Sequence, residues 1–290
     1  MIVTNATRAK LDQLAMYVER ECGRQACIQA VVAIGSVGAG RAGASSDIDA
    51  FVFMSPLDLY AVPAEFAWVP ETGAVLSIFA PEAETAIAFD FTRVDLAQWR
   101  SPGFDWPEPH KAELAAGTVV FDRDGSVSTL ISARTAYSDE IQRARLDDAI
   151  TRLDQLLAGD GPRGAWDRHG PTVAHDRLKV ACDSLLAALF ALNRRWRPWP
   201  SRALEGALAL NWLPGDFEPR MLTALIGGGR DLPGFEQRVA ALRAMFADCC
   251  AQATALGLYG PDPVSDAFIR SHDEPGRAWN MADWRARHAA

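Results

Sequence analysis

Residues 28–54 contain the feature that most constrains the fold: two apolar runs separated by a loop of small residues. The first run, residues 28–34, is rich in β-branched residues and stops at Gly35-Ser36, which predicts a buried strand ending in a turn. The second run, residues 48–54, predicts another strand. The ten residues between Ser36 and Asp47 include three glycines and two serines, a composition that suits a close-packed turn and loop.

Two aspartates stand at the start of the second run. Asp47 and Asp49 are separated by Ile48, and residues i and i+2 of a strand point to the same face. The two carboxylates therefore project together, while Ile48 packs on the other side. Like charges beside a core strand are costly unless a positive charge lies between them. Carboxylate oxygens are hard ligands that suit Mg²⁺, so the pair predicts a site for magnesium.

The turn before the aspartates has the properties of a phosphate cradle. Glycine at position 35 lets backbone N–H groups approach a phosphate closely, and a following helix would direct its positive end at the same point. Ser36, Arg41 and Ser46 are the side chains around this loop that we predict to contact a nucleotide, although Arg41 is also explained as a surface arginine. A phosphate cradle beside metal-binding carboxylates describes a site for nucleotidyl transfer.

Composition limits the classes of partner. The chain has 290 residues and a net charge of −8, which argues against a broad nucleic-acid surface but leaves room for a local basic pocket. The five cysteines form no CxxC pair, which favours a reducing, cytoplasmic compartment. The first residues lack the pattern of a signal peptide, and the longest apolar run, residues 185–192, is too short to cross a membrane. We therefore expect a cytoplasmic protein without a membrane partner.

The hydrophobic pattern changes near residue 135. Before it, a helix is predicted over residues 5–21, with Asn5 or Thr7 as its N-terminal cap, and one or two helices are expected in all. Further strands are predicted at residues 74–80, 85–94 and 118–121. After it, the pattern is helical throughout, with helices predicted over 141–157, 175–196, 201–211 and 234–257 and a break at 160–164. The predicted fold class is α+β: a domain of residues 1–135, in which helices flank a mixed β-sheet, and an all-helical domain of residues 136–290.

The motif of the first domain resembles the signature of a known superfamily. The series Ile34-Gly35-Ser36, a ten-residue spacer and Asp47-Ile48-Asp49-Ala50 is similar to that of the polymerase-β-like nucleotidyltransferases. More distantly, most of the chain resembles their aminoglycoside and lincosamide adenylyltransferase branch. The resemblance implies two Mg²⁺ ions bound by Asp47 and Asp49, and transfer of AMP from ATP to a hydroxyl of a small molecule. It also implies that the helical domain binds the acceptor.

The resemblance further implies a third carboxylate, which completes the metal site or accepts the proton of the attacking hydroxyl. Asp90 is our candidate, because it stands between Phe89 and Phe91 in a predicted strand. Asp95 and Glu84, nearer the ends of that strand, are alternatives that solvation would also explain. The other explanation of Asp90 is an acid on the exposed face of an edge strand.

A basic residue of the second domain is expected to reach the triphosphate in proteins that resemble this one. Lys179 is our candidate. Asp176, Lys179 and Asp183 share one face of the predicted helix 175–196, so an intrahelical ion pair on a solvated face explains Lys179 as well.

Three functions remain open on the sequence. The first is transfer of a nucleotide to a small hydroxyl-bearing molecule, and the acidic character of the protein favours a cationic antibiotic as that molecule. The second is adenylylation of another protein. The third is a nucleotide-binding regulatory module without turnover. The presence of three candidate carboxylates argues against this third function. The acceptor, the choice between ATP and other nucleoside triphosphates, and the oligomeric state are not determined by the sequence.

Overall fold

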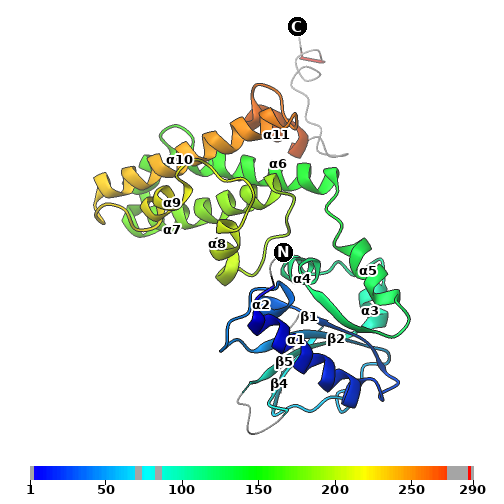
Figure 1. The fold of residues 1–290 in the computed structure, drawn as a ribbon. Helices are drawn as coiled ribbons and strands as arrows, with labels where there is room; N and C mark the ends of the chain where they lie inside the picture. Colours follow the sequence, from blue (N-terminus) through cyan, green and yellow to red (C-terminus); the bar gives the residue numbers. More distant parts are fainter. Residues whose placement is uncertain (1–2, 69–73, 82–86, 273–286, 289–290) are drawn as a thin grey trace. The chain divides into compact units, whose positions relative to one another are not determined.

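The fold is described from a computed structural model of the chain, over residues 3–68, 74–81, 87–272 and 287–288. The chain divides into two compact units, Met1–Ala136 and Tyr137–Ala290 (Figure 1). Among the described residues, none of the helices has the length and apolar character that crossing a membrane requires. Each unit has its own core, and each is described by itself below.

The first unit is built on a six-stranded mixed sheet with the strand order β3-β4-β5-β2-β1-β6. Its strands are β1 (Ile28–Ala33), β2 (Ile48–Met54), β3 (Phe66–Trp68), β4 (Ala74–Phe79), β5 (Phe89–Asp95) and β6 (Thr118–Asp122). Among the described strands, β2 and β5 run parallel, and the other neighbouring pairs are antiparallel. The predicted strands are all present. The structure adds β3, whose three residues are too few to show a periodic pattern, and the start of the predicted strand 85–94 lies partly outside the described residues.

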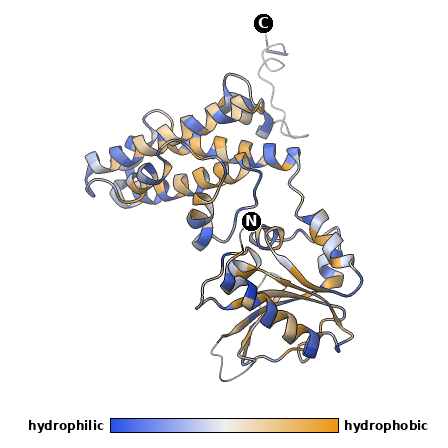
Figure 2. Cartoon of the chain, viewed as in Figure 1, coloured by the Kyte–Doolittle hydropathy of each residue, from blue (hydrophilic) through white to orange (hydrophobic). Residues whose placement is uncertain are grey.

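Helices cover both faces of this sheet, because its strands carry apolar side chains on each face. On one face, Ile48, Ala50 and Val52 of β2 join a buried cluster with residues of α1 (Asn5–Tyr17). On the other face, Phe51 and Phe53 join a cluster with residues of α3 (Leu96–Arg100), α4 (Glu108–Ala115) and α5 (Ser126–Arg134). The strands accordingly show largely apolar colouring in Figure 2. The first unit thus has a helix–sheet–helix arrangement.

The first unit contains more helix than the sequence predicts. A one-turn helix α2 (Gly35–Gly38) follows β1, and a π-helical turn (Val18–Cys22) continues α1. The added helices are one to three turns long, which is too short for a clear 3.6-residue periodicity. The N-cap of α1 is Thr4 rather than the predicted Asn5 or Thr7, and its side chain accepts a hydrogen bond from the Thr7 N–H at 3.0 Å.

The second unit is helical over its described residues, as predicted. Its helices are α6 (Asp139–Leu157), α7 (Gly161–Leu192), α8 (Pro200–Leu208), α9 (Phe217–Ile226), α10 (Leu232–Ala255) and α11 (Pro263–His272). The predicted break is present but shorter than residues 160–164: α6 ends at Leu157, and α7 begins at Gly161 with Pro162 in its first turn, where proline is tolerated. A second interruption, which was not predicted, lies within α7 at Gly170, which has a φ of 79° and is followed by Pro171. The short helices α9 and α11 were not predicted.

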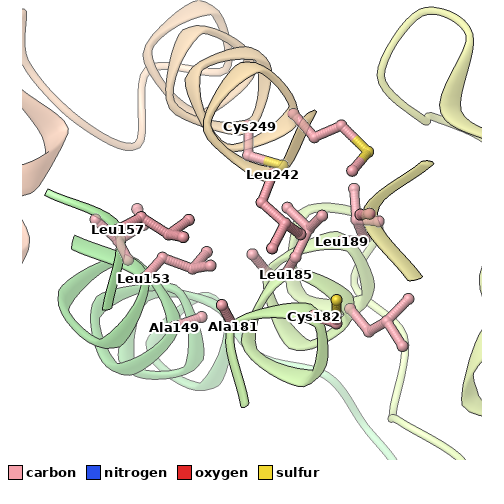
Figure 3. Close-up of a cluster of buried hydrophobic side chains, with 14 of the residues drawn as sticks. Ala149, Leu153, Leu157, Ala181, Cys182, Leu185, Leu189, Leu242 and Cys249 are labelled. Atoms are coloured by element: carbon pink, nitrogen blue, oxygen red, sulfur yellow. The ribbon is translucent and has the colours of Figure 1, made fainter. Parts of the chain in front are cut away.

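The core of the second unit lies between α6, α7 and α10. Leu153 of α6, Leu185 of α7 and Leu242 of α10 are fully buried, and they face one another in Figure 3. Burial of a leucine side chain contributes about 1.5–3 kcal/mol relative to exposure, so this layer of leucines stabilises the unit.

Candidate active site

The candidate carboxylates are brought together by the one parallel strand pair of the sheet. Asp49 of β2 is the direct neighbour of Asp90 of β5, so the two side chains share a face. Asp47 immediately precedes β2, two residues before Asp49, and is exposed, whereas Asp49 and Asp90 are half-buried. Because β5 lies between β4 and β2, the interpretation of Asp90 as an acid on an edge strand is wrong.

Gly35 lies directly against Asp49. Its φ is +59°, a left-handed conformation that favours glycine, and a Cβ atom added there would lie 2.4 Å from Asp49 Oδ2. The N–H of Ile34 donates to the Asp49 carbonyl at 2.9 Å, which joins the end of β1 to β2 at this point. The first N–H groups of α2, which starts at Gly35, point out of the helix end. Both the backbone conformation and the contact with Asp49 therefore require glycine at position 35.

Replacing Gly35 with alanine is expected to lower the free energy of unfolding by about 1–3 kcal/mol, the cost of a strained left-handed residue plus displacement of Asp49. Urea denaturation followed by circular dichroism measures this loss. Gly43→Ala is the matched control in the same loop, because its nearest neighbour would be Ser46 Oγ at 3.9 Å, an ordinary contact. Equal stability of the two variants would contradict the requirement for glycine at position 35.

Negative charge accumulates around Asp90. Burial raises the pKa of the Asp90 carboxyl, and the charges of Asp47 and then Glu113 raise it further. Ionised carboxylates that lie this close repel one another, and a bound cation would remove the repulsion. The carboxyl of Asp90 therefore has a higher proton affinity than an exposed aspartate, which suits a group that accepts a proton.

The donor set fits a hard divalent cation in its chemistry, because it consists of carboxylate oxygens. Over the described part of the chain, however, the structure has no group of three or more His, Cys, Asp or Glu side chains arranged to hold a metal as they stand. Mutual repulsion of the ionised side chains is the physical reason to expect them apart until a cation is bound. The carboxylates lie where the neighbouring strands β2 and β5 begin, and they are not arranged as a metal site in advance.

The other predicted side chains of the first unit lie around the loop between β1 and β2. Ser36 is half-buried in α2, and its carbonyl accepts from the Arg41 N–H at 2.9 Å. The side chain of Arg41 is exposed. Ser46 Oγ accepts from the Gly43 N–H at 3.1 Å, so this serine shapes the loop. Contact of these three side chains with a nucleotide stays a prediction.

Of the two alternatives to Asp90, Asp95 does not lie beside Asp49. Asp95 is at the opposite end of β5, paired with Met54, where its side chain accepts from the Ala97 N–H at 2.9 Å and caps α3. Glu84 lies outside the described residues. The cap gives Asp95 a structural role.

Lys179 belongs to α7 of the second unit, and its side chain is exposed. Asp183, one of its two expected partners, pairs instead with Arg197 at 3.1 Å. Over the described residues, Lys179 forms no ion pair within 4 Å. The intrahelical ion pair therefore does not explain this lysine, and its contact with a triphosphate stays a prediction.

Sequence reasoning missed two residues of α4. Glu113 acts on the pKa of Asp90, and its Oε2 lies 3.0 Å from Nδ1 of His110, a buried residue to which the sequence analysis assigned no role. The only signal in the sequence is the i, i+3 spacing of His110 and Glu113 on a helix, which many surface pairs share.

Comparison with known proteins gives little further information. No protein-family model and no curated protein matches the sequence. Among solved structures, the chain is similar to a nucleotidyltransferase-like protein from Exiguobacterium sibiricum 255-15, with 12% identity and a TM-score of 0.44 over 97% of this chain and 83% of that one. A likeness at this level establishes neither a shared family nor a shared activity.

Proposed function

We propose that the protein is a magnesium-dependent nucleotidyltransferase that moves a nucleoside monophosphate, AMP from ATP, to a hydroxyl of a small molecule. The observation that carries the proposal is the pairing of Asp49 with Asp90 on neighbouring parallel strands, against a left-handed Gly35. The resemblance of the Gly-Ser and Asp-x-Asp motif to the polymerase-β-like superfamily supports it.

In this proposal, Asp47 and Asp49 would hold the two cations, with Asp90 as the third carboxylate. Bound magnesium would supply positive charge at the phosphates and polarise the α-phosphorus. The N–H groups at Gly35 and Ser36 bind phosphate oxygens, with Arg41, Ser46 and Lys179 as further nucleotide contacts.

Asp90 orients the acceptor hydroxyl and accepts its proton. The hydroxyl oxygen attacks the α-phosphorus in line, a new P–O bond forms, and the bond to the β-phosphate oxygen breaks, so pyrophosphate leaves with its electron pair. Most of the acceleration comes from positioning and charge neutralisation, as in other transfers of phosphoryl-type groups.

The acceptor we propose is a hydroxyl-bearing antibiotic of the aminoglycoside or lincosamide type, bound by the helical second unit. Two observations support it: the resemblance to the antibiotic-modifying branch and the acidic character of the chain, with a net charge of −8, which favours a cationic acceptor. Adenylylation of a protein and nucleotide binding without turnover are the alternative outcomes of the test.

Pyrophosphate release tests the proposal. The full chain is incubated with Mg²⁺, each of ATP, GTP, CTP and UTP, and a panel of aminoglycosides and lincosamides, and the small-molecule product is identified by mass spectrometry. We expect release that requires both ATP and one class of acceptor. Labelling of a protein in place of a small molecule would favour the second function, and nucleotide binding without release with any acceptor would favour the third.

A further inference from the structure

The start of α1 is joined to the loop that follows α2, where α1 and α2 pack together (Figure 1). Thr4, the N-cap of α1, donates its N–H to the Gly40 carbonyl at 3.3 Å. Thr4 Oγ1 donates to the Ala42 carbonyl at 2.9 Å. Thr7 Oγ1, in the first turn of α1, accepts from the Ala42 N–H at 2.8 Å. The two threonines therefore bind the backbone on both sides of Arg41.

The two hydroxyl groups and Ala42 form a closed ring of hydrogen bonds. Thr4 Oγ1 and Thr7 Oγ1 lie 2.8 Å apart. The Ala42 carbonyl can only accept, so Thr4 gives it the single hydrogen of its hydroxyl, and the hydroxyl hydrogen of Thr7 goes to Thr4. Thr7 Oγ1 in turn accepts from the Ala42 N–H. Both hydroxyl hydrogens are thus used, and both polar backbone groups of Ala42 are bound.

Most of this ring is buried. Thr7 is fully buried and Ala42 is 3% exposed. Hydrogen bonds are stronger away from water, and a buried donor that loses its acceptor costs stability. The Arg41 N–H donates to the Ser36 carbonyl at 2.9 Å, so residues 40–42 are held by α2 as well as by α1. The side chain of Arg41 is exposed, whereas its backbone is fixed.

We propose that Thr4 and Thr7 are positioning residues of the nucleotide site, which hold the backbone of Arg41 beside the phosphate cradle at Gly35. This inference rests on the proposed function and names two residues that the motif does not contain. Ordering the backbone of one residue during binding would weaken affinity by about tenfold. A loop that is fixed beforehand lets Arg41 contact a triphosphate without that cost.

Thr7→Val, which keeps the shape of the side chain but removes the hydroxyl, tests this inference in the full chain. We expect the Kd for ATP with Mg²⁺, measured by calorimetry, and the KM for ATP in pyrophosphate release each to rise about tenfold. Because Arg41 would bind substrate and transition state alike, kcat should stay within about twofold. Thr7→Ser keeps the hydroxyl and should behave as the wild type. Thr129→Val, which removes a hydroxyl that donates to the Gly125 carbonyl in α5, is the matched control and should change neither value.

Two further measurements distinguish positioning of Arg41 from a general loss of stability. Arg41→Gln alone should weaken ATP binding, and adding Thr7→Val should have little further effect, because Thr7 acts through Arg41. Without nucleotide, trypsin should cleave the bond between Arg41 and Ala42 about tenfold faster in Thr7→Val, because the N–H of that bond loses its acceptor. Mass spectrometry of fragments 1–41 and 42–290 measures the cleavage.

A second variant removes the other hydroxyl of the ring. Thr4 is exposed, and glycine is an acceptable N-cap, so Thr4→Gly should fold even if Thr7→Val does not. It loses the donor to the Ala42 carbonyl and should raise the Kd for ATP and the rate of cleavage after Arg41 as Thr7→Val does.

The outcomes separate this inference from the proposed function. If the wild type releases pyrophosphate from ATP but Thr7→Val and Thr4→Gly bind ATP as the wild type does, the positioning role is refuted and the proposed function stands. An equal loss of affinity on adding Thr7→Val to Arg41→Gln would also refute it. If the wild type binds ATP without release, the proposed function fails and the Kd values decide the inference. If the wild type binds no ATP, both fail.

Discussion

Replacing Asp49 with asparagine is expected to lower kcat for pyrophosphate release by about 10³-fold, equivalent to about 4 kcal/mol of transition-state stabilisation. Asparagine has nearly the same shape as aspartate, so the contact with Gly35 and the pairing of β2 with β5 are retained. Only the charge is lost. Because that charge acts through a cation on the phosphorus in the transition state, kcat falls much further than the affinity for ATP.

Asp95→Asn is the matched control for this prediction. It makes the same chemical change on β5, five residues from Asp90 and so about 16 Å along the strand. Asparagine also caps helices well, so the N-cap of α3 survives and activity should stay within about twofold of the wild type. Steady-state kinetics with ATP and Mg²⁺ measures both variants. If Asp49→Asn retained activity like that of Asp95→Asn, the cation-binding role of Asp49 would be excluded.

Removing the carboxylate of Asp147 is expected to destabilise the second unit by about 3 kcal/mol. Asp147 lies in α6 with 8% of its surface exposed, and it accepts from Tyr259 at 2.7 Å and from Arg270 of α11 at 2.8 and 3.0 Å. Asp147→Ala leaves a buried hydroxyl and a guanidinium without their acceptor. The partial exposure of Arg270, 35% of its side chain, places the expected loss at the lower end of the range for breaking a buried ion pair.

Urea unfolding followed by circular dichroism at the helical band measures this loss. Asp148→Ala is the matched control, an exposed acid one residue further along α6, and should change the free energy of unfolding by about 0.5 kcal/mol or less. Tyr259→Phe removes one hydrogen bond and should cost about 1 kcal/mol. A similar cost for Asp147→Ala and Asp148→Ala would show that the contact between α6 and α11 does not depend on the ion pair.

The strands of the first unit were predictable because each is a short apolar run with a turn at its end. The predicted span of β2, residues 48–54, agrees with the structure, since every residue of that strand except Asp49 is apolar and buried. The short helices α3, α4 and α5 were not predictable, because one to three turns give no reliable period. Their positions depend on the buried face of the sheet that they cover.

The candidate site, like the fold, was predictable from the sequence only in part. Asp47 and Asp49 were recognisable from local order alone, because two carboxylates one residue apart on a strand share a face whatever the rest of the chain does. The need for glycine at position 35 was predictable in type, since a tight turn favours glycine, but its contact with Asp49 is visible only in the structure.

The sequence by itself determined the α+β character of the first unit, the helical character of the second and the aspartate pair, because these follow from residue type and spacing within one segment. Only the tertiary structure decided that Asp90 rather than Asp95 lies beside Asp49, and that Glu113, 3.0 Å from His110, acts on the pKa of Asp90. Strand order and helix docking bring together residues more than forty positions apart, and no local pattern records which strands become neighbours. The physical reason is that pairing and burial are properties of the assembled sheet.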